Sequence, residues 1–180
     1  MTMPTGLLNK TTEIVTTLSA GRELAGRLPA GAYRAGADQN GSGSIGAHLR
    51  HILDHYVNFL GGLASGRIDY DVRRRGTVVE QDPAAAIEAI DGICARMGEL
   101  APVSASMPLK VRVSADGSLP GHWAASSVLR ELDFLLSHTI HHYAIVAMLC
   151  GRVGVFVDPN FGMAPATRQY LALLAIREAG

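Results

Sequence analysis

The chain has 180 residues, which is long enough to bury one hydrophobic core but short for two independent ones. Hydrophobic residues make up 48% of it and charged residues 18%, a composition that excludes an intrinsically disordered protein. Lysine plus arginine and aspartate plus glutamate each number 16, and this neutral balance argues against a nucleic-acid binder.

The N-terminal segment has neither a basic patch nor an apolar run, so we expect no secretory signal. A run of about 18 apolar residues is also absent from the sequence, which predicts no membrane partner. Cys94 and Cys150 are too few for a disulfide framework. These features predict a single cytoplasmic domain over residues 1–180.

Two helices are predicted in the first part of the chain. Apolar residues recur at helical spacing over residues 7–28, and Pro29 and Gly31 end this helix. A linker over residues 29–43 leads to Ser44, a good N-cap for a second helix that runs to about residue 65. Residues 66–82 carry charges without a helical period, so we expect a long surface loop there.

The next elements include a short stretch of β-structure. Asp82 followed by a proline predicts a third helix over residues 83–100. Residues 108–121 alternate between apolar and polar and contain the turn signal Asp116-Gly117, which predicts a short β-hairpin.

Two further helices complete the prediction. A long helix is expected over residues 124–150, with Gly151 as the C-cap candidate, and a short helix from Pro165 through Ile176. The four or five predicted helices make an all-α helical bundle, with a β-hairpin inserted before the last long helix and a short C-terminal helix.

Seven histidines stand out, and six of them lie in the second helix and the last long helix. Helical residues four apart differ by about 40° around the axis and about 6 Å along it, so their imidazoles can hold one metal ion. His138 and His142 have this spacing and fall on the apolar stripe, whereas His141 falls on the polar face. The pattern predicts His138 and His142 as inward-facing metal ligands.

The second helix supplies His48, His51 and His55 as candidates for a third ligand. Packed helices lie about 8–10 Å apart, so one of these imidazoles can reach the pair on the other helix. Periodicity favours His55 or His48, because His51 lies at the polar edge of the apolar stripe. Three neutral imidazoles that leave positions open to water are typical of a catalytic metal site.

Several other polar residues are also candidates for the site. Glu131 falls on the inward stripe of the last long helix, where it is either a buried carboxylate that needs a partner beside the metal ligands or a solvated charge at the start of the helix. The arginine run over residues 73–75 is either a solvated face or an anion-binding site. His122, beside the single tryptophan, is interpreted as structural.

The segments Ser44-Ile45-Gly46-Ala47-His48-Leu49-Arg50-His51-Ile52-Leu53-Asp54-His55 and His138-Thr139-Ile140-His141-His142 together resemble the DinB-like (damage-inducible) superfamily. The resemblance implies a four-helix bundle with a divalent metal held by three histidines. In that pattern the first ligand is His51, followed three residues later by Asp54, and the other two are His138 and His142. The chain departs from the pattern at Gly43, where many members carry tryptophan, and in its hairpin.

Characterised members of the superfamily include thiol S-transferases that use low-molecular-weight thiols such as bacillithiol, and a mycothiol-dependent maleylpyruvate isomerase. The resemblance therefore implies a divalent-metal-dependent transferase or hydrolase that acts on a small molecule, with zinc or nickel as the metal. Glu131 or His55 would orient or deprotonate the reacting group. Tyr70, Arg73 and Arg75 would bind an anionic substrate at the mouth of the site.

Two further expectations concern assembly and the alternative function. Members of the family are often dimers, and the apolar last helix would contribute a face to a homodimer. The alternative to an enzyme is a non-catalytic metal- or ligand-binding bundle, in which the ion only joins two helices. A ferritin-like di-iron site is excluded, because such sites need E-x-x-H and no glutamate here is followed three residues later by histidine.

Overall fold

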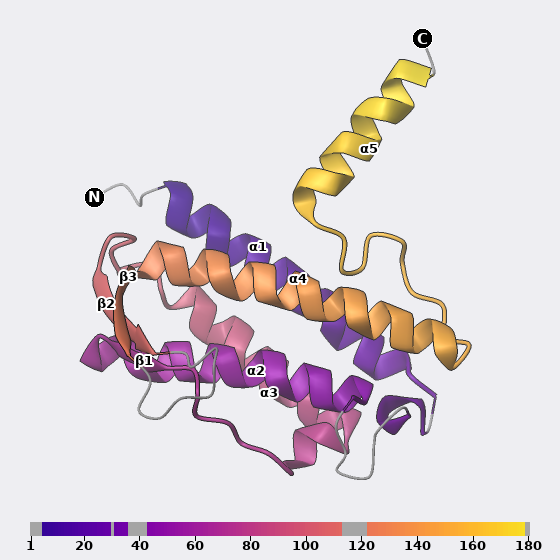
Figure 1. Cartoon of the computed structure of the whole chain (residues 1–180), viewed down its shortest axis with the longest axis horizontal. Coiled ribbons are helices and arrows are strands. Elements are labelled where there is room, and N and C mark those ends of the chain that lie inside the picture. The colour runs from indigo at the N-terminus through magenta and orange to yellow at the C-terminus, as the bar shows by residue number, and fades with distance from the viewer. Residues whose placement is uncertain (1–4, 30, 36–42, 113–121, 179–180) are drawn as a thin grey trace.

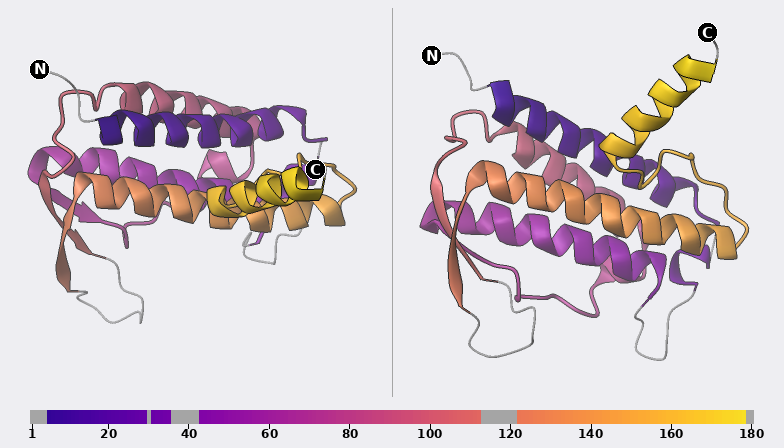
Figure 2. Two further views of the ribbon diagram at one scale, coloured as in Figure 1. Left: turned by 90° about the horizontal axis from the view of Figure 1, so that it is seen from above. Right: turned by 45° about the horizontal axis from the view of Figure 1, so that its top comes forward.

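Four long helices form the body of the protein, which we describe in a computed structural model that covers residues 5–29, 31–35, 43–112 and 122–178 (Figure 1). They are α1 (Thr5–Arg27), α2 (Ile45–Gly62), α3 (Pro83–Gly98) and α4 (Val128–Arg152). Both α1 and α2 contact α3 and α4, so that α1 and α3 lie as one layer over α2 and α4 (Figure 2). The predicted four-helix bundle is confirmed.

The hydrophobic core lies between these two layers. Each long helix buries an apolar stripe in it, including Leu18 of α1, Phe59 of α2, Ile90 of α3 and Leu132 of α4. Full burial of a side chain of this size stabilises the folded state by roughly 1.5–3 kcal/mol. Because α2 and α4 share this core, their neighbouring faces are held in a defined register.

The predicted helix starts at Ser44 and Asp82 are confirmed. The Ser44 hydroxyl accepts a hydrogen bond from the backbone N–H of Ala47 at 3.0 Å, and an Asp82 carboxylate oxygen accepts one from Ala84 at 2.8 Å. Each cap satisfies a backbone donor that has no partner within the first turn of its helix. In the preceding linker, a short 3-10 helix, Ala32–Arg34, buries Tyr33.

A small sheet caps the end of the bundle where α4 begins (Figure 1). Strands β2 (Pro108–Arg112) and β3 (Trp123–Ser127) pair antiparallel, with Val111 opposite Ala124, as the predicted hairpin requires. The predicted Asp116-Gly117 turn lies outside the described residues. The pairing continues through residue 127, so α4 begins later than the predicted residue 124.

The prediction of a loop throughout residues 66–82 is wrong. Strand β1 (Arg67–Asp69) pairs parallel to β2 and buries Ile68, and a 3-10 helix, Val78–Glu80, follows. A strand of three residues is too short to show an alternating pattern, and its partner lies about 40 residues further along the chain. The prediction therefore lacked any local signal for it.

Helix α4 ends beyond its predicted C-cap, and the C-terminal helix that follows leaves the bundle. Helix α4 continues through Gly151, the predicted C-cap, to Arg152, and the chain turns at Gly154, whose φ is +72°. The predicted C-terminal helix is confirmed as α5 (Pro165–Glu178), which projects away from the bundle (Figure 1).

Helix α4 is also long and apolar enough to cross a membrane, judged by length and composition alone. Core helices of globular proteins commonly share this property, and α4 packs along α1 and α2.

Candidate metal centre

Five histidines from α2 and α4 face one another between the two helices, and we call them the histidine cluster: His48, His51, His55, His138 and His142. The ring centroid of His51 lies 4.9 Å from that of His138 and 4.6 Å from that of His142. The rings of His138 and His142 are 4.5 Å apart, as expected for residues one turn apart on the same face of a helix. The three histidines predicted as ligands therefore lie together.

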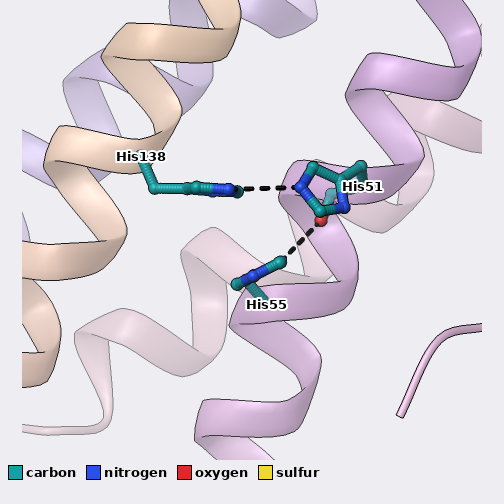
Figure 3. A group of neighbouring side chains, drawn as sticks. All are labelled: His51, His55 and His138. Atoms are coloured by element: carbon teal, nitrogen blue, oxygen red, sulfur yellow. Dashed lines mark hydrogen bonds between the residues drawn. The ribbon is translucent and has the colours of Figure 1, made fainter. Parts of the chain in front are cut away.

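The closest approach across the two helices joins His51 and His138 (Figure 3). Their Nε2 atoms are 3.2 Å apart. Two nitrogen ligands of a tetrahedral ion at about 2.0–2.1 Å are themselves about 3.4 Å apart, so this spacing fits a shared metal ion.

His55 completes a group of three possible ligands with these two histidines. One nitrogen each from His51, His55 and His138 lies within 4.8 Å of the others. The Nδ1 of His55 lies 3.0 Å from the backbone carbonyl of His51, which can only accept, so Nδ1 carries the hydrogen and Nε2 keeps its lone pair (Figure 3). Such a bond fixes the tautomer that a metal-binding imidazole needs.

His142 and His48 form a second contact in the cluster. Their Nδ1 atoms are 2.9 Å apart, and their rings are 5.2 Å apart. The group whose ligand nitrogens all lie within 4.8 Å of one another thus contains His55 where the family pattern has His142. His51 and His138 belong to both sets. His142 as the third ligand stays a prediction, and His48 and His55 stay the alternatives to it.

The cluster favours neutral imidazoles. Burial, together with the charges of the neighbouring histidines, lowers the pKa of His51 from 6.5 to about 3, and that of His142 to about 4. The pKa of His138 falls to about 2 for the same reasons. Neutral imidazole is the form that binds a metal ion, so the donor set and its surroundings fit a divalent cation.

Aromatic rings enclose the side of the cluster next to His55. Tyr70 stacks on His55 with ring centroids 5.3 Å apart, and Phe134 lies 5.6 Å from His138. Phe134 precedes His138 by four residues, so helical spacing alone would have identified this neighbour. The wall shields His55, which is only 6% exposed.

Tyr70 and Glu131 were predicted as substrate-binding and catalytic residues. The Tyr70 side chain is 2% exposed and donates a hydrogen bond of 2.9 Å to Glu131, so it lies in the wall rather than at an exposed mouth. Glu131 is fully buried and also accepts hydrogen bonds from Ser126 and Arg130, which confirms that this carboxylate has partners. The catalytic role of Glu131 and substrate contact by Tyr70 stay predictions.

The arginine run lies beside the cluster because a buried ionic network holds its segment against α2. Arg50 of α2 donates to Glu80 at 2.7 Å and to Asp54 at 3.2 Å, and the backbone N–H of Arg74 also donates to Asp54 at 3.2 Å. Sequence analysis missed this network, whose partners are up to 30 residues apart.

Arg73 and Arg75 are both exposed on this segment. Arg73 is near enough to the cluster that its positive charge contributes to the lowered pKa of His51 and of His55, after burial. His141 and His122 are exposed, as expected of histidines outside the site.

This chain is similar to a known family and to a named relative. The family model described as the DinB superfamily matches residues 13–146, a range that includes the whole histidine cluster. FK506-binding protein 5 of Rhizopus delemar is 35% identical to this chain over 105 residues, which are 58% of this chain and 27% of that protein. The chain thus spans little more than a quarter of the length of that relative.

Proposed function

This chain belongs to the DinB superfamily, and on that premise we propose that it is a divalent-metal-dependent enzyme acting on a small molecule, a thiol S-transferase or a hydrolase. The proposed ligands are His51, His138 and His142, and the proposed metal is zinc or nickel, both of which accept imidazole. A low-molecular-weight thiol is the proposed co-substrate.

One observation carries the proposal. The Nε2 atoms of His51 and His138 approach to 3.2 Å across two helices, with the ring of His142 within 4.6 Å of both rings. Unprotonated imidazoles at this Nε2 spacing can share one cation between His51 and His138, and the ring of His142 lies beside both of them as the proposed third ligand. When bound, a divalent ion lowers the pKa of a coordinated water or thiol, which makes a nucleophile available near neutral pH.

The residues around the ligands have separate roles in this proposal. His55 has its Nδ1–H held by a backbone carbonyl, so its Nε2 is free to accept a proton from a water or thiol. Tyr70 stacks on His55 and is held in turn by Glu131, so these two residues position the base. We therefore assign Glu131 to positioning, since its described hydrogen-bond partners are Tyr70, Ser126 and Arg130.

Arg73 and Arg75 are the proposed contacts for an anionic substrate. Both are exposed, and the backbone N–H of Arg74 between them donates to Asp54. The charge of Arg73 is close enough to the cluster to add to the effect of burial in lowering the pKa of His51. A guanidinium binds a carboxylate with two parallel hydrogen bonds, a geometry that suits substrates carrying carboxylate groups.

Metal content is the first test. Protein purified with zinc or nickel is analysed by elemental analysis for the wild type and for the variants His51→Ala, His138→Ala, His142→Ala and His55→Ala. His141→Ala is the matched control, because His141 is an exposed neighbour of His142 on the same helix. We expect the first three variants to lose the metal and the control to keep it. Loss in His55→Ala and retention in His142→Ala would instead make His55 the third ligand.

The second candidate function is a non-catalytic metal-binding bundle, which the close packing of α2 on α4 through histidines favours. A panel of thiols with electrophilic substrates, assayed with metal-loaded protein, separates the two functions. Turnover that is lost in Arg73→Ala but kept in His141→Ala would support the enzymatic function. A melting temperature that depends on metal, without turnover of any thiol and electrophile pair, would support the non-catalytic function.

The proposed location is the cytoplasm. Cys94 and Cys150 are both free, and free thiols together with a thiol co-substrate suit a reducing compartment.

A further inference from the structure

The outer face of the small sheet carries cations around the single tryptophan of the chain. We call Arg67, Lys110, Arg112 and Trp123 the basic sheet face, because the register of the three strands places them on the same side. The residues that alternate with them on β1 and β2 are buried, so this side is turned away from the core. The guanidinium carbons of Arg67 and Arg112 lie 4.5 Å and 5.3 Å from the centre of the Trp123 ring.

Part of this positive charge has no carboxylate beside it in the described part of the chain. Asp69 pairs with Arg112, and the charge of Asp71 acts on the same guanidinium. Arg67 and Lys110 are exposed, and neither forms an ion pair with a described carboxylate. The face therefore presents positive charge beside an aromatic ring that is 37% exposed, and an anionic partner complements such a surface.

Strand β3 also offers backbone groups at a free edge, because it is the last strand in the order of the sheet. Lys110 donates its backbone N–H to Gly66 on the β1 side at 2.8 Å, so it forms no hydrogen bond with its opposite residue, Ala125. In an antiparallel pair, such a residue points its N–H and C=O away from the neighbouring strand. The same holds for Trp123, because the carbonyl of its partner Arg112 accepts a hydrogen bond from the β1 side at 2.9 Å. Within the described ranges, no strand pairs with this edge.

One added strand can use the edge and the face together. Such a strand would lie about 5 Å from β3 and about 10 Å from β2, and its alternate side chains would lie on the basic sheet face. Ala125 lies directly between Lys110 and that position, and its side chain is small. The Lys110 ammonium can therefore extend over Ala125 toward a carboxylate of the added strand.

These features favour a peptide over a nucleic acid as the anionic partner. Unpaired N–H and C=O groups along an edge bind the backbone of an extended peptide. The guanidinium of Arg67 lies over the Trp123 ring, where a base would otherwise stack. The chain as a whole has 16 basic and 16 acidic side chains, so it lacks the long-range positive field of nucleic-acid binders.

We infer that an extended acidic segment of a partner protein pairs with the free edge of β3 and places alternate carboxylates over the basic sheet face. Main-chain hydrogen bonds supply affinity in this mode of binding, and the alternate side chains supply specificity. The inference depends on neither the metal nor the proposed activity, because the sheet lies at the end of the bundle where α4 begins (Figure 2).

The fluorescence of Trp123 tests the inference directly, because the chain has no other tryptophan. The full chain is titrated with a synthetic peptide of alternating glutamate and threonine. We expect a saturable change in tryptophan emission. The same peptide with lysine in place of glutamate should produce no change.

Two variants separate the face from the edge. Lys110→Glu reverses the charge of an exposed side chain, and we expect it to weaken peptide binding by about tenfold or more. Ala125→Pro removes an N–H that β2 does not use, so the sheet keeps its hydrogen bonds while the added strand loses one, and we expect weaker binding again. Arg152→Glu is the matched control and should bind as the wild type does, because this exposed arginine lies at the opposite end of α4 from the sheet. Circular dichroism verifies that each variant is folded.

A single-stranded oligonucleotide, titrated in the same way, is the third probe. An emission change with the oligonucleotide but not with the acidic peptide, or with neither of them, would overturn the inference. Peptide binding that Lys110→Glu leaves unchanged would refute the role of the basic sheet face. Binding that a folded Ala125→Pro variant leaves unchanged would refute the strand pairing.

Discussion

Tyr70 connects the histidine cluster to the most deeply buried carboxylate in the described part of the chain. Its ring stacks on His55 and its hydroxyl donates to Glu131, which is 0% exposed. Burial, followed by the negative charge of Glu131, raises the pKa of Tyr70, so the hydroxyl keeps its hydrogen and remains a donor. At the scale of single residues, this hydrogen bond joins the wall of the site to a buried carboxylate.

The Tyr70→Phe variant tests this role. It leaves one oxygen of a buried carboxylate without its donor, which costs about 1–3 kcal/mol. We expect urea denaturation to show that loss in the free energy of unfolding. Tyr170→Phe, at a tyrosine that is 61% exposed, is the control and should be unchanged. Equal stability of both variants would contradict the assignment.

Arg50 is the second residue on which the site depends. Its guanidinium pairs with Glu80 and Asp54, both buried, and so holds the segment that carries the arginine run. Removing one partner of a buried ion pair typically costs about 3–5 kcal/mol, because the remaining charges lose their compensation.

We therefore expect Arg50→Ala to lower the free energy of unfolding by about 3 kcal/mol, as measured by denaturant titration. The matched control is Arg22→Ala, whose partner Asp91 is exposed and whose ion pair should contribute little to stability, because solvent screens it. A loss for Arg50→Ala no larger than that of the control would show that the network does not hold the segment.

At the scale of elements, the chain that follows α2 packs closely against its end and helps to fix the helix that carries three histidines of the site. Gly62 lies against β1, where an added Cβ would be 2.3 Å from the backbone oxygen of Arg67 and 2.8 Å from Ile68. The neighbouring Gly61 has no atom within 4 Å of the same position. The two adjacent glycines therefore form a natural pair for comparison.

We expect Gly62→Ala to destabilise the protein by about 1–3 kcal/mol, since the backbone of β1 would have to move. Gly61→Ala should be neutral or stabilising by up to about 1 kcal/mol, because alanine favours helix more than glycine does. Thermal melting of the two variants checks the difference. The same shift for both would mean that β1 does not pack on α2 as described.

The elements that the sequence predicted correctly are those whose causes are local. Ser44 and Asp82 cap helices through atoms two or three residues away, and the apolar stripes of α1 to α4 repeat every three or four residues. Strand β1 was missed because its partner is about 40 residues distant. The pairing of Arg50 with Glu80 was missed for the same reason, because the two residues are 30 positions apart in the sequence.

The candidate site was predictable to the same extent. The pairing of His138 and His142 follows from their i,i+4 spacing on one helix. The helix that faces them was predictable because it carries three further histidines. Which ring nitrogens lie closest to one another depends on how α2 packs on α4 and on the orientation of each ring. The spacing of residues along the sequence determines neither. Hence the structure groups His55 with His51 and His138, while His142 approaches His48.

At the scale of the whole molecule, the histidine cluster links stability to pH when metal is removed. The pKa values of His51 and His142 fall from 6.5 to about 3 and about 4 in the folded chain. Below pH 6.5 the unfolded chain therefore binds protons that the folded chain does not bind. The free energy of unfolding of the chelated protein should decrease as the pH falls from 6.5 to about 4.

Urea denaturation at several pH values, with a chelator present, checks this dependence. The His51→Gln variant, which removes one such group, should show a shallower decrease than the wild type. A stability that is constant over this range would contradict the burial of neutral histidines.

The central claim is that α2 and α4 hold one cation between their histidines. The most direct measurement is the anomalous diffraction of crystals of the zinc- or nickel-loaded protein, collected at the absorption edge of the metal. The account predicts a single peak between His51 and His138, with each Nε2 at about 2.0–2.1 Å from it and a third imidazole from the cluster. A metal-loaded crystal whose peak lies elsewhere, with these two rings free of metal, would contradict it.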